Sequence, residues 1–240
     1  MYFGDVGPKG YHMSKSRPSF MAQGSYYLTP TFKVQAAYTA MWLTGYDVDA
    51  VDPFRFNRRL NFRNFVQEFS VSGQYFLFPF DRYQRDHKWS PYVSAGVGVL
   101  RHNPKAVYNS AWYDLHPLGT EGQYAGEDLD PTVEYDSYSL TQFVVPVGLG
   151  LRYYSGDKWA VSLDVNYRFT FTDYLDDVGG EYAPIRDLAA SGDFLMSSEL
   201  AFRGRGGLEN YPEPGSQRGD DRSTDTFMTI QITASRYIFR

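Results

Sequence analysis

The sequence predicts an all-β protein, a single closed antiparallel transmembrane β-barrel of about eight strands with short periplasmic turns and long extracellular loops. Apolar residues recur at every second position, which is the period of a strand, rather than every 3.6 residues. Short and long connections alternate along the chain, and aromatic residues, 18% of the total, gather near the strand ends. We therefore interpret residues 1–240 as one barrel domain of a bacterial outer membrane.

The composition excludes several other classes of protein. No stretch approaches the roughly 18 consecutive apolar residues that a membrane-spanning helix needs. The chain has no cysteine, which excludes disulfides, thiolate metal sites and a cysteine nucleophile. Its net charge of -5 gives no electrostatic reason to expect a nucleic-acid partner.

The first residues predict the end of a strand that enters a loop. Tyr2 and Phe3 are followed at once by Gly4 and Gly7, and the segment has neither the basic nor the apolar region of a signal peptide. We expect that Met1 is an internal residue and that the start of a first strand is missing.

Seven further strands follow from the two-residue period. In the clearest, residues 159–171, every odd position is apolar or aromatic, whereas the even positions include Asp164 and Arg168. Alternation places these two sets on opposite faces. In chain order, the pattern predicts strands over residues 19–28, 32–42, 68–77, 92–99, 142–153, 159–171 and 228–235. The alternation slips after Ser235, which predicts a bulge in the last strand.

The connections fall into two kinds. Residues 29–31, 81–90 and 155–158 are short, whereas residues 44–64, 102–140 and 172–225 are long. In a barrel, all short turns then lie at one rim and all long loops at the other, and we expect both termini at the short-turn rim. A soluble β-sandwich would alternate in the same way, but long structureless loops count against a compact soluble domain.

The aromatic residues form two groups. Tyr26, Phe32, Tyr75, Trp89, Tyr92, Tyr153, Trp159, Tyr237 and Phe239 lie near short turns, and Trp42, Phe62, Phe65, Phe169, Phe171 and Phe227 lie near long loops. Strand propensity explains the abundance of aromatic residues but not this clustering as well. Two belts that flank an aliphatic band are typical of an outer-membrane barrel, in which Val147 and Leu163 would face lipid.

The inward-facing set includes charged residues. These are Lys33, Glu68, Arg152, Asp164 and Arg168. Because isolated buried charges are costly, we interpret them as a paired polar network, with a proton or ion path as the alternative. Gln35, Met41 and Gln74 also face inward and help to fill so small a barrel, so we expect no open pore.

Catalytic motifs are absent from the sequence, and we predict no catalytic, cofactor or metal site. His102 and His116 share one loop with Ser110 and Asp114, which leaves a barrel-top hydrolase or acyltransferase as a remote alternative. Calcium could bind the acidic groups of the loops, but solvated loops are the favoured interpretation. These groups are Asp47, Asp49 and Asp52; Glu127, Asp128 and Asp130; Asp173, Asp176 and Asp177; and Asp220 and Asp221.

Loop motifs carry a specific resemblance. They are residues 57–60 (NRRL), 103–106 (NPKA), 112–115 (WYDL), 117–123 (PLGTEGQ), 138–142 (YSLTQ) and 171–178 (FTDYLDDV). In this order, over nearly the whole chain, the sequence resembles the PorG-like outer-membrane barrel family of Bacteroidetes. It departs from the family at the N-terminus, where a signal peptide and a full first strand are absent, and residues 191–221 match loosely.

The resemblance implies a non-enzymatic component, without a cofactor, of the type IX secretion and gliding machinery. The family is associated with a periplasmic ring of PorN and the lipoprotein PorK. A periplasmic partner would meet the short-turn rim, where Arg and Tyr have the composition enriched at interfaces. The candidate contact residues are Arg82, Tyr83, Arg85, Lys88, Asp157 and Lys158. A merely hydrated rim is the alternative for this surface. A generic barrel similar to OmpA or OmpW, for envelope integrity or small-solute passage, is the alternative function.

Overall fold

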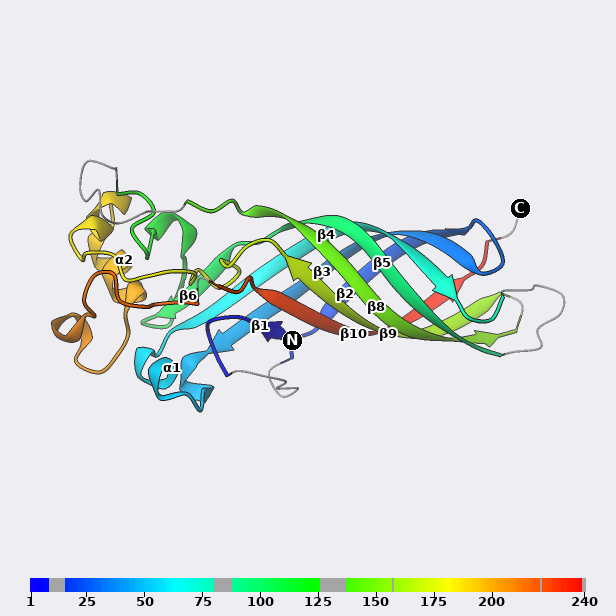
Figure 1. The fold of residues 1–240 in the computed structure, drawn as a ribbon, viewed down its shortest axis with the longest axis horizontal. Helices are drawn as coiled ribbons and strands as arrows, with labels where there is room; N and C mark the ends of the chain where they lie inside the picture. The colour runs from blue at the N-terminus through cyan, green and yellow to red at the C-terminus, as the bar shows by residue number, and fades with distance from the viewer. Residues whose placement is uncertain (9–15, 80–87, 126–136, 157, 221, 239–240) are drawn as a thin grey trace.

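The computed structural model describes residues 1–8, 16–79, 88–125, 137–156, 158–220 and 222–238. The protein is a strongly curved antiparallel sheet whose strands run obliquely along the long axis of the molecule (Figure 1). The long connections gather at one end of the sheet, the loop end, and the short connections at the other, the turn end. Among the described residues, no helix is long and apolar enough to cross a membrane.

The strands confirm the predicted antiparallel organisation. They are β1 (Tyr2–Phe3), β2 (Ser19–Tyr27), β3 (Phe32–Tyr46), β4 (Asn61–Phe76), β5 (Trp89–Arg101), β6 (Pro104–Tyr108), β7 (Ala111–Asp114), β8 (Thr141–Ser155), β9 (Trp159–Thr170) and β10 (Thr226–Arg236). Neighbours in the sheet follow the order β1-β10-β9-β8-β5-β4-β3-β2, and β6 and β7 form a hairpin beside β4. Strands β3 and β4 pair as far as Tyr46 and Asn61. The connection between them therefore covers residues 47–60 and is shorter than the loop predicted over residues 44–64.

Short helices occupy the long connections, which were expected to be loops. They are η2 (Asp47–Asp49), α1 (Pro53–Arg58), η3 (His116–Leu118), η4 (Asp187–Ser191), α2 (Phe194–Ala201) and η5 (Gly207–Asn210). Helix α1 begins after Asp52, whose carboxylate accepts a hydrogen bond from the Phe54 amide, and Pro53 takes the first helical position. The loop end is therefore a folded cap (Figure 1).

Side chains alternate between an outer and an inner face as the period predicts. On β9, Leu163 is 48% exposed and the adjacent Asp164 only 7% exposed, and Val147 on β8 is half-buried on the outer side. The exposed outer residues form a broad apolar band across the sheet. Its members include Phe69, Val71, Val93, Val97, Val99, Phe143, Leu149, Leu151, Val161, Leu163, Val165, Phe169, Ile230 and Ile232.

Two predictions about the chain ends are wrong. The amine of Met1 donates to the Met228 carbonyl at 2.7 Å, so the first residue lies along β10 rather than at the turn end. The cause is that β1 pairs with the beginning of β10, at Phe227. Strand β10 also keeps a regular register with β9 through Arg236, without the predicted bulge. Arg236 simply takes an outward position, with its guanidinium 5.9 Å from the ring centre of Trp159.

Four aromatic residues assigned to the belts lie inside instead. One is Tyr237, whose hydroxyl is buried and whose ring centre lies 6.4 Å from that of Tyr27. Phe239 lies outside the described residues. Phe62 and Phe227 are fully buried and Tyr92 is nearly so. The first two belong to an apolar cluster, here called the apolar plug, which fills the interior near the loop end. Its members are Val6, Met41, Leu43, Leu60, Phe62, Val66, Leu100, Val144, Leu175, Val178 and Phe227. Val6, Leu175 and Val178 come from loops, so the cap reaches into the sheet.

The sheet is not closed. Among the described residues, no hydrogen-bonded ladder joins β2 to β10, and we call the gap between these edges the seam. The structure thus confirms the antiparallel sheet of the prediction, with an inner and an outer face, but not the predicted closure into a barrel.

Truncating the apolar plug should destabilise the fold. Phe62→Ala should lower the free energy of unfolding by about 3–5 kcal/mol, because it leaves a cavity in a fully buried site. Urea titration in detergent micelles would measure the change. Val51→Ala is the control, since Val51 is 94% exposed and should contribute less than about 0.5 kcal/mol. Equal effects of both variants would contradict the plug.

Candidate functional site

The five charged residues predicted to face inward are all buried inside the sheet. Lys33 projects from β3, Glu68 from β4, Arg152 from β8, and Asp164 and Arg168 from β9. Two-residue periodicity on four different strands brings them into one interior.

One direct ion pair crosses this interior. Arg168 Nε lies 2.7 Å from Glu68 Oε2, although the two residues are 100 positions apart in the chain. Ser70 donates to the other carboxylate oxygen of Glu68 at 2.9 Å. Arg168 also donates to Thr229 Oγ1 at 2.5 Å, so the pair links three strands: β4, β9 and β10.

The other three predicted charged residues form hydrogen bonds with neutral side chains. Arg152 donates to Tyr27 Oη at 2.8 Å and to Ser162 Oγ at 2.9 Å. Asp164 accepts a hydrogen bond from the hydroxyl of Tyr92. Lys33 Nζ lies 3.3 Å from Gln35 Oε1. The predicted network therefore combines one ion pair with hydroxyl and amide contacts. The sequence did not reveal the role of Tyr92, because its position near a turn suggested a belt residue.

Removing one charge of the interior pair should be costly. Glu68→Gln should destabilise the fold by about 3–5 kcal/mol, because a buried guanidinium loses its counter-charge. The double variant Glu68→Gln/Arg168→Met should recover much of the loss. Lys105→Gln is the matched control, because it breaks a half-exposed pair with Asp114 that should contribute less than about 1 kcal/mol. Urea titrations that gave the same loss for both single variants would argue against the pair's role.

A second concentration of charge lies at the loop end. Three buried ion pairs stabilise the cap: Arg55–Asp5 at 3.2 Å and Arg218–Glu121 at 2.6 Å join separate loops, and Arg58–Asp47 at 2.8 Å lies within the β3–β4 connection. With Asp173, Asp176, Asp177 and Asp225, these residues form the loop-end cluster. Its carboxylates outnumber its arginines, which leaves a surplus of acidic groups in the cap.

Hydroxyl groups bridge the surplus carboxylates. Tyr2 Oη lies 2.5 Å from Asp176 Oδ2 and 2.7 Å from Asp225 Oδ1. Burial, reinforced by the charge of Asp5, raises the pKa of Asp176 to about 7. Burial and the charge of Asp176 raise the pKa of Asp173 to about 9 and that of Asp225 well above its usual range. The favoured interpretation of solvated acidic loops is therefore wrong for these positions.

The raised pKa values predict that alkaline pH loosens the cap. A carboxyl group with a higher pKa in the folded state binds more protons folded than unfolded between about pH 4 and its folded pKa. Stability should therefore fall as the pH rises from about 5 to about 9. Hydrogen exchange of the amides of residues 172–178 would measure this decline. Asp225→Asn should flatten it, and a cap that became more stable over this range would contradict the prediction.

The geometry does not assemble the remote catalytic alternative. His116 Nε2 lies 3.1 Å from the Tyr138 carbonyl and its Nδ1 lies 3.2 Å from Tyr124 Oη, whereas Asp114 pairs with Lys105. His102 is buried, and burial lowers its pKa to about 4. Neither histidine contacts Asp114 in these interactions.

A metal site is likewise not assembled in the described part of the chain. No group of three or more His, Asp or Glu residues there is placed to hold a metal ion. Glu127, Asp128, Asp130 and Asp221 lie outside the described residues.

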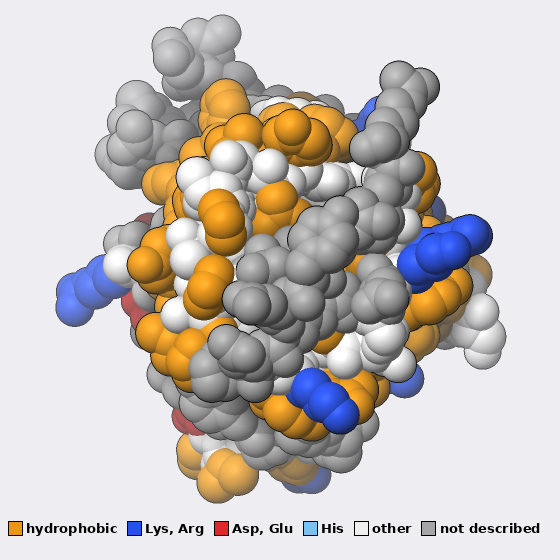
Figure 2. Space-filling view, turned by 90° about the vertical axis from the view of Figure 1, so that its right-hand side faces the viewer, with side chains coloured by type: hydrophobic (Ala, Val, Ile, Leu, Met, Phe, Trp, Pro, Cys, Tyr) orange, Lys and Arg blue, Asp and Glu red, His pale blue; other side chains and the backbone are white. Residues whose placement is uncertain are grey.

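The predicted partner surface is described only in part. Lys88 and Lys158 are exposed at the turn end, and their carbonyls accept hydrogen bonds from the amides of Tyr154 and Tyr237. Arg82, Tyr83, Arg85 and Asp157 lie outside the described residues. Figure 2 looks onto this end and shows hydrophobic side chains over much of its described surface, with Lys and Arg side chains projecting among them.

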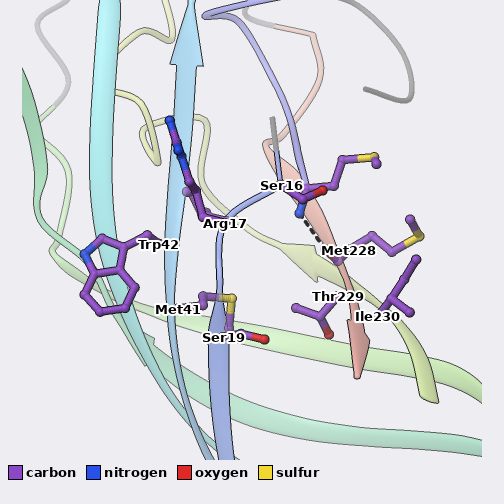
Figure 3. Close-up of a pocket in the computed structure, with 10 residues that line it drawn as sticks. Ser16, Arg17, Ser19, Met41, Trp42, Met228, Thr229 and Ile230 are labelled. Carbon is purple, nitrogen blue, oxygen red and sulfur yellow. Dashed lines mark hydrogen bonds between the residues drawn. The ribbon is translucent and has the colours of Figure 1, made fainter. Parts of the chain in front are cut away.

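The seam is a further candidate site, which the sequence patterns did not predict. A cavity of about 180 Å³ lies between Met41 and Trp42 on one side and Met228 and Ile230 on the other (Figure 3). A second cavity of about 520 Å³ lies nearer the turn end, between β2 and the last residues of β10. Hydrophobic patterning detects strands but does not show whether the sheet they form has unpaired edges.

Comparison with known proteins gives one match. Residues 1–115 match a family model described as a domain of unknown function (DUF6089). This part of the chain runs from β1 to the β6–β7 hairpin and includes the β2 edge of the seam. No curated protein and no solved structure matches the chain. The first part of the chain is thus similar to a family whose function is not defined.

Proposed function

We propose that this protein is a non-enzymatic outer-membrane barrel of the type IX secretion and gliding machinery. The observation that carries the membrane assignment is the apolar band on the outer face of the sheet. Ile232, Val97 and Leu149 are exposed by 80%, 67% and 66%, although they lie in the interior of long strands. Soluble monomers rarely expose contiguous apolar patches of more than a few hundred Å². Lipid is the solvent that suits such a surface.

Aromatic residues at both ends of the band support the same proposal. Tyr26, Tyr75 and Trp159 are exposed near the turn end, and Trp42 and Phe171 near the loop end. Aromatic girdles of this kind mark the two interfaces of a membrane barrel. Lys and Arg side chains at the turn end can extend from the girdle towards water (Figure 2).

Closure of the sheet belongs to this proposal. Unpaired backbone groups cost several kcal/mol each in hydrocarbon, so a sheet edge exposed to lipid is unfavourable. We infer that the seam is closed in the membrane and that the protein forms a barrel of about eight strands.

The secretion role rests on the resemblance of the loop motifs to the PorG-like family. The proposed partner is the periplasmic PorK and PorN ring, which would meet the turn end. The exposed Lys88 and Lys158 and the aromatic side chains at that end have suitable chemistry for a protein contact. The burial of Arg58 against Asp47 gives the NRRL motif a structural role in the cap.

A generic OmpA- or OmpW-like barrel is the second candidate. The apolar plug and the Arg168–Glu68 pair fill the interior, which disfavours passage of solutes. An envelope-stabilising role would leave the same outer face but would need no ring partner.

Lipid exposure predicts a depth-dependent cost for charge. Leu163→Arg should destabilise the folded protein in lipid vesicles by about 2–4 kcal/mol if the residue lies near the bilayer midplane. Ser155→Arg is the control, because Ser155 is exposed at the turn end of β8. Denaturant titrations in vesicles would compare the two, and equal costs would count against a lipid-facing band.

Co-purification from outer membranes tests the secretion role. The detergent-solubilised protein should retain PorK and PorN. The double variant Arg82→Glu/Arg85→Glu should assemble normally but lose the ring and reduce cargo secretion. Arg101→Glu is the control, since Arg101 is exposed at the opposite, loop end of β5. Absence of the ring from the unmodified protein would favour the envelope role, whereas a ring retained by the double variant would place the contact elsewhere.

A further inference from the structure

The seam has two incompletely paired edges. Every residue of β2 pairs with β3 on one side, and no backbone ladder joins its other edge to a described strand. Side chains still meet across the seam at the turn end, where the ring centres of Tyr27 and Tyr237 are 6.4 Å apart. Strand β10 pairs with β9 along its whole length, but of the described residues only β1 and Met1 pair with its other edge, at its start. In the residues that follow Met228, the edge of β10 that is not paired with β9 faces the seam (Figure 3).

The strand directions specify what fits between these edges. Six successive antiparallel pairings lead from β10 to β2, so these two strands run in the same direction. Direct closure would need a parallel pairing within an otherwise antiparallel sheet. A single strand antiparallel to both β10 and β2 could form an antiparallel hydrogen-bonded ladder with each of them, as the other strands of the sheet do.

Strand β1 already occupies the loop end of this position. It runs antiparallel to β10, with Tyr2 opposite Phe227. Met1 and Met228 exchange both backbone hydrogen bonds, at 2.7 and 2.8 Å. Residues that led into Met1 in the same register would lie opposite residues 229–236 of β10 and would pass through both cavities of the seam.

A buried polar atom without a hydrogen-bond partner among the described residues lies on the inner face of β10, the strand that borders the seam. Gln231 lies on the inner face of β10 and is 8% exposed, and its Oε1 atom is buried without a hydrogen-bond partner. Its neighbours Ile230 and Ile232 face outward. Directly opposed residues of an antiparallel pair share one face, so the residue opposite Gln231 would also point inward.

We propose that the seam is a binding site for one extended polypeptide segment, joined in line to β1 and antiparallel to both β10 and β2. Its apolar side chains lie outward beside Ile230 and Ile232, and its inward side chain opposite Gln231 donates a hydrogen bond. A separate strand fits less well, because it would have to end against Met1, whose backbone groups already bind Met228. This inference rests on the proposed barrel, since it identifies the element that closes it.

The test adds such a segment to the chain. About nine residues, the length of a membrane strand, are fused before Met1, with valine at outward positions and threonine or asparagine at inward ones. The control extension has the same composition with the alternation shifted by one residue, which reverses its faces. Amide hydrogen exchange of β2 and β10 is measured in detergent micelles, where the result does not depend on membrane insertion.

The correct extension should slow exchange at both edges by at least about tenfold and leave the central strands β4 and β5 unchanged. The shifted extension should protect the edges much less. The proposal is overturned if the edges of the unextended chain are already protected, or if neither extension protects them. It is also overturned if both extensions protect them equally, or if the same nine residues added as a free equimolar peptide protect them as well as the fusion does.

Separate measurement of insertion into vesicles distinguishes this inference from the proposed function. Normal insertion with unprotected edges would contradict only the strand site. Failed insertion with protected edges would contradict only the membrane role.

Discussion

The structure depends above all on the two-residue period of a strongly curved sheet. Because successive side chains point to opposite faces, each long strand presents one row to the interior and one to the surroundings. Leu163 and Asp164 are adjacent in the chain, yet they lie in an apolar outer band and a polar interior. A shift of one residue would exchange these environments, so the apolar band and the buried charges together fix the register of the sheet.

The interior and the cap form one continuous structure. Arg168 and Glu68 join opposite parts of the sheet, and Phe62 and Phe227 fill the space between that pair and the loops. Above them, Tyr2 bridges two buried carboxylates of the loop-end cluster. These contacts hold the long connections in a defined arrangement. The connections themselves consist of short helices, turns and irregular segments.

Local patterns predicted the strands well because each strand carries its own period. Contacts between residues far apart in the sequence could not be predicted in this way. The burial of Phe62 and Phe227 depends on loops that enter the interior, so nearness to a strand end wrongly suggested an aromatic belt. Asp47 and Asp176 looked like solvated loop residues because their partners Arg58 and Tyr2 are identified only by the fold. Arg236 interrupted the hydrophobic pattern but not the backbone register, which explains the wrongly predicted bulge.

The central claim is that the outer face of the sheet contacts lipid. Fluorescence quenching by lipids brominated at defined depths along the acyl chain tests it most directly. One single-tryptophan variant carries Leu163→Trp, and another retains only Trp112 of the loop-end hairpin β6–β7. We predict strong quenching of tryptophan at position 163 by deeply brominated lipid and little quenching of Trp112. Equal quenching of the two, or no quenching at position 163, would contradict the claim.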